Sequence, residues 1–89
     1  MKLLKISIRG HVQGVGYRHF ASRAAREYCV TGFVRNEYNG NVYIEACGSN
    51  ESLEAFCSML RSGPSRSRVE DVKIVDGGEC DGFATFSMH

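Results

Sequence analysis

The chain has 89 residues, a formal net charge of +1 and a hydrophobic fraction of 43%. This length fits a single domain over residues 1–89, which can bury roughly 60 to 65% of its extended surface and fold without a metal ion. The near-neutral charge argues against a nucleic-acid partner. The short apolar stretches argue against a membrane span or a signal peptide, so we expect a soluble, cytoplasmic protein.

Residues 3–9 alternate between apolar and polar side chains, which predicts a half-buried strand. From Tyr17 to Tyr28 the apolar residues recur every three or four positions, which predicts an amphipathic helix of about three turns. Two strands are then predicted, over residues 30–37 and 42–47.

A hairpin turn between these two strands is indicated by Asn39 and Gly40. A two-residue loop would place Arg35 on the apolar face of the second strand. A three-residue loop with Gly40 in the left-handed conformation would place Val34 and Asn36 there instead. The sequence leaves this register open, but in both cases Asn36 lies near the end of its strand, where its side chain can reach a loop rim.

A second helix is predicted after Ser49 or Asn50 as its N-cap, and Gly63 and Pro64 end it. Two further strands follow, separated by a glycine-rich turn: residues 69–75, the turn 77–82, and residues 83–88. The order βαββαβ with a short extra C-terminal strand predicts an α+β, ferredoxin-like two-layer sandwich. We expect an antiparallel sheet with two helices on one face.

The four cysteines are Cys29, Cys47, Cys57 and Cys80. They form no CxxC pair and have no histidine at metal-ligand spacing, so no metal site is expected. Without a secretory signal, four reduced thiols are expected. Cys57 lies on the apolar face of a predicted helix and belongs in the core. The other three lie near element ends, where pairing is possible but the connectivity is undecided.

Residues 10–18 read GHVQGVGYR and carry three glycines between the first strand and the first helix. A loop with so few side chains can turn its backbone N–H groups toward an anion, and the helix dipole adds to the attraction. Arg18 stands in the first helical turn, where a cation opposes the dipole at a cost of about 0.3 to 1 kcal/mol. We therefore expect a negative group nearby. His11 and His19 flank the loop and are interpreted as solvated.

These segments resemble the two motifs of the acylphosphatase family. The first motif is Gly-x-Val-Gln-Gly-Val-x-(Phe/Tyr)-Arg, and every defined position is filled by Gly10, Val12, Gln13, Gly14, Val15, Tyr17 and Arg18. The second motif runs from a Gly-aromatic pair through an Asn to a distant Gly, and is matched by Gly32, Phe33, Val34, Arg35, Asn36, Gly40, Val42 and Gly48. The likeness continues through GPSRSRV and covers nearly the whole chain.

The resemblance implies hydrolysis of the carboxyl-phosphate bond of acyl phosphates to a carboxylate and inorganic phosphate, without a metal or cofactor. Phosphate would be both product and competitor, and a monomer is expected. By the family's assignments, Asn36 orients the attacking water. The phosphate would be held by Arg18 and by the backbone N–H groups of His11, Val12, Gln13, Gly14, Val15 and Gly16.

Two other classes of function remain as alternatives. A ferredoxin-like RNA-binding module would need an aromatic spacing that TGFVRNEY lacks. A non-catalytic anion-binding domain would have no need of Asn36. The two motifs do not indicate which acyl group the natural substrate carries, because neither motif contacts that group.

Overall fold

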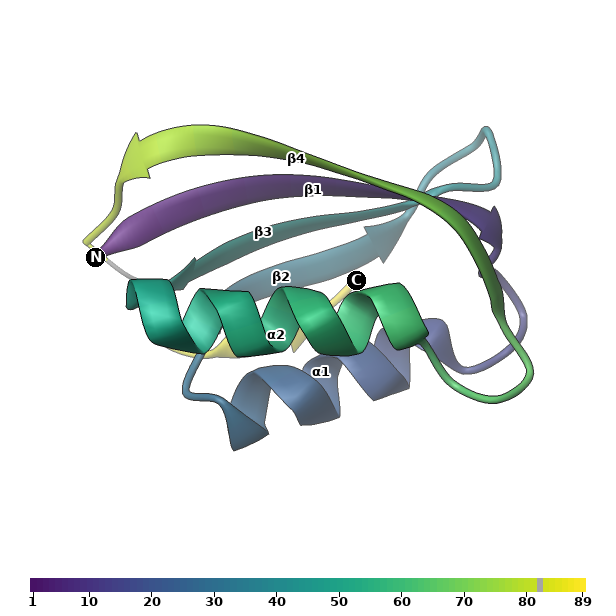
Figure 1. Ribbon diagram of the computed structural model, residues 1–89, viewed down its shortest axis with the longest axis horizontal. Coiled ribbons are helices and arrows are strands. Elements are labelled where there is room, and N and C mark those ends of the chain that lie inside the picture. The colour runs from purple at the N-terminus through teal and green to yellow at the C-terminus, as the bar shows by residue number, and fades with distance from the viewer. Residues whose placement is uncertain (82) are drawn as a thin grey trace.

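The computed structural model describes residues 1–81 and 83–89. Its elements, in chain order, are β1 (Lys2–His11), α1 (Tyr17–Glu27), β2 (Thr31–Asn36), β3 (Val42–Gly48), α2 (Asn50–Ser62), β4 (Arg68–Glu79) and β5 (Phe86–Met88). The strands form a five-stranded sheet in the order β4-β1-β3-β2-β5, and Figure 1 shows both helices on one face of it. The predicted two-layer, ferredoxin-like architecture is confirmed.

The core lies between the two helices and the inner face of the sheet. On the sheet side, the fully buried side chains are Ile6, Ile8, Val34, Val42, Ile44 and Ala46. On the helix side they are Ala21, Ala25, Phe56 and Leu60. These residues share the apolar faces that the strand and helix periods predict. No helix within residues 1–81 and 83–89 is both long and apolar enough to cross a membrane.

The C-terminal strand differs from the expectation of a purely antiparallel sheet. The pairs β1–β3, β1–β4 and β2–β3 are antiparallel, whereas β5 pairs with β2 in parallel. β4 ends at the end of the sheet where β2 begins, and the chain crosses there from one edge strand to the other. A strand that starts at that end runs in the direction of β2. β5 is also shorter than the predicted strand 83–88.

β4 is longer than the predicted strand 69–75 and continues to Glu79. Its pairing with β1 shifts register near this end, which makes Gly77 the extra residue of a β-bulge. The glycines therefore bend the strand instead of ending it, and the expected turn over 77–82 is wrong for its first residues. Gly82 lies outside the described residues.

The β2–β3 hairpin has the three-residue loop of the two alternatives. Asn36 pairs with Val42, and the Glu37 N–H donates to the carbonyl oxygen of Asn41 at 2.9 Å. Gly40 has φ +92°, the left-handed conformation that this loop requires. The extra loop residue places Asn36 on the same face of β2–β3 as buried Val42, the face toward the helices.

The two helices are fixed at defined points. The Ser49 hydroxyl accepts a hydrogen bond from the Ser52 N–H at 3.1 Å, so Ser49 is the N-cap of α2 and Asn50, the other candidate, is its first residue. The Tyr17 hydroxyl donates to the Leu60 carbonyl oxygen at 2.6 Å across the helix pair, and burial raises the pKa of Tyr17. The start of α1, next to the glycine loop, is thereby anchored on α2.

One cysteine pair is oxidised. Cys47, at the end of β3, forms a disulfide with Cys80, just after β4. The expectation of four reduced thiols is therefore wrong for this pair, while Cys29 and Cys57 are free. Cys57 is buried in the core as predicted, and burial raises the pKa of its thiol.

Two glycine substitutions should differ sharply in their effect on stability. At Gly32 (φ +138°) an added Cβ would lie 1.8 Å from the Glu45 carbonyl oxygen, whereas at Gly40 it would meet no atom within 4 Å. We expect Gly32→Ala to lower the free energy of unfolding by about 3 kcal/mol or more, through clash and strain together. Gly40→Ala should cost about 1 to 2 kcal/mol, from strain alone. Urea unfolding measures both, and equal losses would contradict the close strand approach.

Loss of the disulfide should lower the free energy of unfolding by about 3 to 4 kcal/mol, the chain-entropy value for a bridge that spans 33 residues. The substitution is Cys80→Ser, and urea unfolding is the measurement. Cys29→Ser removes an exposed, free thiol and serves as the control. An equal stability of the two variants would show that the bridge contributes nothing.

Candidate active site

The loop between β1 and α1 exposes its backbone on one side. Gly14 and Gly16 have φ +77° and +82°, and Val15 between them keeps an ordinary negative φ. Alternating signs of φ can direct successive N–H groups toward one concave side, which attracts anions. A Cβ at either glycine would meet no atom within 4 Å, so the backbone is open to a ligand.

Both ends of this loop are held by the core. Val12 and Tyr17 are each only 1% exposed, so their side chains anchor the segment on either side of the glycines. Gly10 (φ +138°) lies against β4, where an added Cβ would be 2.0 Å from the Arg68 carbonyl oxygen. The loop is therefore a fixed feature at the end of the sheet, with its open side toward solvent.

Arg18 has an unexpected partner at the C-terminal end of the described chain. The N-terminus of α1 has no side-chain cap and no acidic residue in its first turn. The Arg18 guanidinium donates through Nη1 to the carbonyl oxygen of His89 at 2.5 Å. Among the described residues, the partner of the cation is thus a main-chain oxygen of His89. Nothing in the local sequence pattern around residues 10–18 signals this contact.

His89 also links Arg18 to β2. The His89 N–H donates to the Val34 carbonyl oxygen at 2.9 Å, and Val34 lies two residues before Asn36. Arg18 is therefore linked through His89 to the strand that carries Asn36. The two predicted catalytic residues, Arg18 and Asn36, approach this end of the sheet from different elements, α1 and β2.

Asn36 opens onto a cleft beside the loop. The cleft has a volume of about 690 Å³ and is lined by Gln13, Arg35, Asn36, Glu37 and Tyr38. Asn36 is exposed and is the last residue of β2. The structure therefore brings Asn36 together with Gln13 of the loop, while Arg18 does not line this cleft.

Gln13 contacts the hairpin through its side chain. Its Nε2 amide donates to the carbonyl oxygens of Glu37 and Asn41, each at 2.8 Å. The family resemblance implies a role for the backbone N–H of Gln13 only. No short-range pattern predicts these bonds, because they join residues 24 and 28 positions apart.

The two histidines beside the loop are both exposed, as expected: His11 and His19. Within the described ranges 1–81 and 83–89, no three His, Cys, Asp or Glu side chains gather where they could hold a metal ion.

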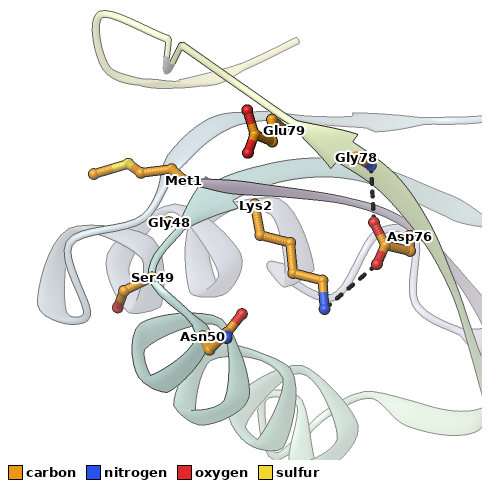
Figure 2. Close-up of a pocket in the computed structure, with 8 residues that line it drawn as sticks. All are labelled: Met1, Lys2, Gly48, Ser49, Asn50, Asp76, Gly78 and Glu79. Atoms are coloured by element: carbon orange, nitrogen blue, oxygen red, sulfur yellow. Dashed lines mark hydrogen bonds and ion pairs between the residues drawn. The ribbon is translucent and has the colours of Figure 1, made fainter.

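A second cavity of about 430 Å³ lies at the other end of the sheet (Figure 2). Lys2 and Asp76 form an ion pair at 3.4 Å on its wall, and the Gly78 N–H donates to the Asp76 carboxylate at 2.8 Å. This hydrogen bond, aided by Lys2, lowers the pKa of Asp76. β1 separates this cavity from the glycine loop by about 30 Å, ten residues at strand rise. None of the predicted site residues lines it.

The βαββαβ order and the glycine loop in front of α1 define the class of protein: a ferredoxin-like sandwich whose candidate site opens at one end of the sheet. A family model described as Acylphosphatase matches residues 4–88. An acylphosphatase from Oceanobacillus iheyensis is 40% identical over 89 residues, covering 99% of this chain and 98% of that protein. The chain belongs to the acylphosphatase family.

Two solved structures support this assignment to the family. The crystal structure of acylphosphatase from Bacillus subtilis has a TM-score of 0.96 and 31% identity, over 100% of this chain and 99% of that one. Full-length HypF in its phosphate- and nucleotide-bound form has a TM-score of 0.85 and 28% identity, over 99% of this chain but 12% of that one.

The activity is that of an acylphosphatase, a hydrolase whose substrates are acyl phosphates. The resemblance inferred from the two sequence motifs is thereby confirmed. The roles of single residues stay predictions.

Proposed function

We propose that the loop of residues 11–16 and Arg18 bind the phosphoryl group of the acyl phosphate, and that Asn36 orients the attacking water. The observation that carries this proposal is the left-handed pair Gly14 and Gly16, which opens the backbone in front of α1 and next to Arg18. The exposed amide of Asn36 in the cleft beside Gln13 supports the second role.

The proposed chemistry needs neither a metal nor a covalent intermediate. A carboxylate is a good leaving group, and a loose phosphoryl-transfer transition state needs mainly in-line positioning and charge stabilisation. An amide both donates and accepts hydrogen bonds, so Asn36 can position water without acting as a nucleophile. A phosphate oxygen of the substrate would accept the proton of the water.

The contact between Arg18 and His89 is compatible with phosphate binding. A guanidinium carries five N–H donors, and the His89 carbonyl oxygen takes a hydrogen bond from Nη1. The remaining donors can bind two phosphate oxygens. His89 would then hold the side chain in place for the substrate.

We further propose that residues 1–89 form one acylphosphatase domain, supported by the match to residues 4–88. It would act as a cytoplasmic monomer, with phosphate as competitor and no nucleic-acid or membrane partner. Disulfides are rare in a reducing cytosol. A cytoplasmic location therefore requires the Cys47–Cys80 bridge to resist reduction; the 1% exposure of Cys47 would hinder attack on its own sulfur, whereas Cys80 is half-buried.

Substitution of the two site residues should separate phosphate binding from turnover. We expect Arg18→Gln to lower kcat/KM for benzoyl phosphate by about 10²- to 10³-fold or more and to weaken inhibition by phosphate, because charge stabilisation is lost. Asn36→Ala should lower kcat by about 10²-fold or more, because the water is no longer aligned. Its inhibition constant for phosphate should stay within about twofold. Steady-state kinetics measure all three values.

The matched control for the cation is Arg23→Gln, an exposed arginine on the same helix. It should keep wild-type kinetics. Normal turnover by Asn36→Ala would show that Asn36 does not position the water. Unchanged phosphate inhibition in Arg18→Gln would remove Arg18 from the binding site.

The metal-free mechanism predicts that EDTA leaves hydrolysis of benzoyl and acetyl phosphate unchanged. Protein stripped of metal in excess EDTA is assayed with both substrates and with phosphate as the competitor. Activity that disappears in EDTA and returns with a divalent cation would refute the metal-free route. The family's acyl-phosphate activity would stand in that case.

A further inference from the structure

The side chain of Gln13 joins the phosphate loop to the base of the β2–β3 hairpin. Its two bonds reach the carbonyl oxygens of Glu37 and Asn41, which face each other across the hairpin. Each carbonyl oxygen also accepts a bond inside the hairpin: the Glu37 N–H donates to Asn41 at 2.9 Å, and the Gly40 N–H donates to Glu37 at 3.1 Å. Gln13 thus occupies a further acceptor position on both carbonyl groups.

The chemistry of the side chain suits this position. A glutamine amide nitrogen carries two hydrogens, so it can donate to two carbonyl oxygens at once. The amide oxygen of Gln13 could not make these bonds in place of the nitrogen, because it and the main-chain carbonyl oxygens are all acceptors. Both bonds are partly buried, which reduces the competition from water. A single side chain therefore clamps both sides of the hairpin.

The sheet gives this part of the hairpin little support. On the β1 side, the pairing of β1 with β3 reaches Val42 and goes no further toward the tip. On the other side, the pairing of β5 with β2 covers Gly32 to Val34. Asn36 pairs with Val42 and so lies level with the last pair of β1 and β3, and the tip that follows it lies beyond both pairings. The Gln13 side chain ties this end of the hairpin to the phosphate loop.

We propose that the Gln13 side chain is a positioning residue for water attack: it sets the place of Asn36 relative to the bound phosphoryl group. Asn36 directly precedes Glu37, whose carbonyl oxygen Gln13 holds. The inference rests on the proposed role of Asn36. It assigns to the Gln13 side chain a task separate from the phosphate contact proposed for the Gln13 backbone N–H.

A double-mutant cycle tests the proposal in the full chain. Gln13→Met keeps the length of the side chain and the backbone N–H but donates no hydrogen bond. We expect it to lower kcat for benzoyl phosphate about tenfold, since small misplacements of a positioning group are costly. The inhibition constant for phosphate should stay within about twofold. In the Asn36→Ala background, the same change should alter kcat by less than about twofold.

The control removes a hairpin bond that does not reach the loop. The Asn39 side chain accepts from the Asn41 N–H at 3.0 Å, within the hairpin itself. Asn39→Ala should therefore keep kcat near the wild-type value. Thermal unfolding of each variant, with assays well below the transition, separates a loss of folding from a loss of positioning.

If Gln13→Met fails to fold, a second variant, Gln13→Glu, tests the same role. In Gln13→Glu the ionised carboxylate cannot donate to the carbonyl oxygens, whereas the protonated acid can donate to one of them. Its kcat relative to wild type should rise as the pH falls through the titration of the new carboxyl. Arg35 and Glu37, which also line the cleft, are present in both proteins, so the ratio removes their contribution to the pH dependence. A ratio independent of pH would contradict the proposal.

The outcomes distinguish the proposed role of Asn36 from that of Gln13. If Asn36→Ala keeps its kcat, the proposed role of Asn36 fails, and the positioning role of Gln13 fails with it. If Asn36→Ala loses turnover but Gln13→Met does not, only the positioning role is overturned. If both lose turnover and the two losses multiply in the double variant, Gln13 acts independently of Asn36, which also overturns it.

Discussion

The antiparallel pairing of β1 with β3 determines where the site lies. Ile8 near the end of β1 is opposite Val42 at the start of β3. The glycine loop that leaves β1 and the hairpin that enters β3 therefore emerge at the same end of the sheet. Residues more than twenty positions apart can then share one cleft, as Gln13 and Asn36 do. The apolar register of two central strands thus sets the geometry of a polar site at their end.

A second constraint is the number of residues in the hairpin loop. In a strand, a shift by one residue moves every side chain to the other face. The extra loop residue, allowed by left-handed Gly40, brings Asn36 to the face that also holds the helices and hence to the side of α1. With a two-residue loop, Asn36 would point to the open face of the sheet, away from Arg18. Gly40 thereby contributes to the site without lining it.

The local elements could be read from the sequence because their causes are local. Hydrophobic period predicts the strands and helices, and the spacing of glycines before Arg18 predicts an open backbone at a helix start. The contacts that assemble the site are long-range: Gln13 to the hairpin, and Arg18 to His89. Their partners are main-chain carbonyl groups, which every residue has, so no residue type signals them. The parallel direction of β5 likewise follows from a chain crossing that no local pattern encodes.

The C-terminal segment connects the disulfide to the glycine loop. Cys80 is bridged to Cys47 at one end of the sheet, and the chain then pairs with β2 and reaches Arg18 through His89 at the other. The bridge shortens the free length of this segment, so it favours the short β5 pairing, which three residues alone would hold weakly. Because His89 also donates to Val34, the segment holds Arg18 against the strand that carries Asn36. The glycine loop before α1 and the arginine that follows it are therefore held at two points. Gln13 of the loop bonds to the hairpin, and Arg18 bonds to His89.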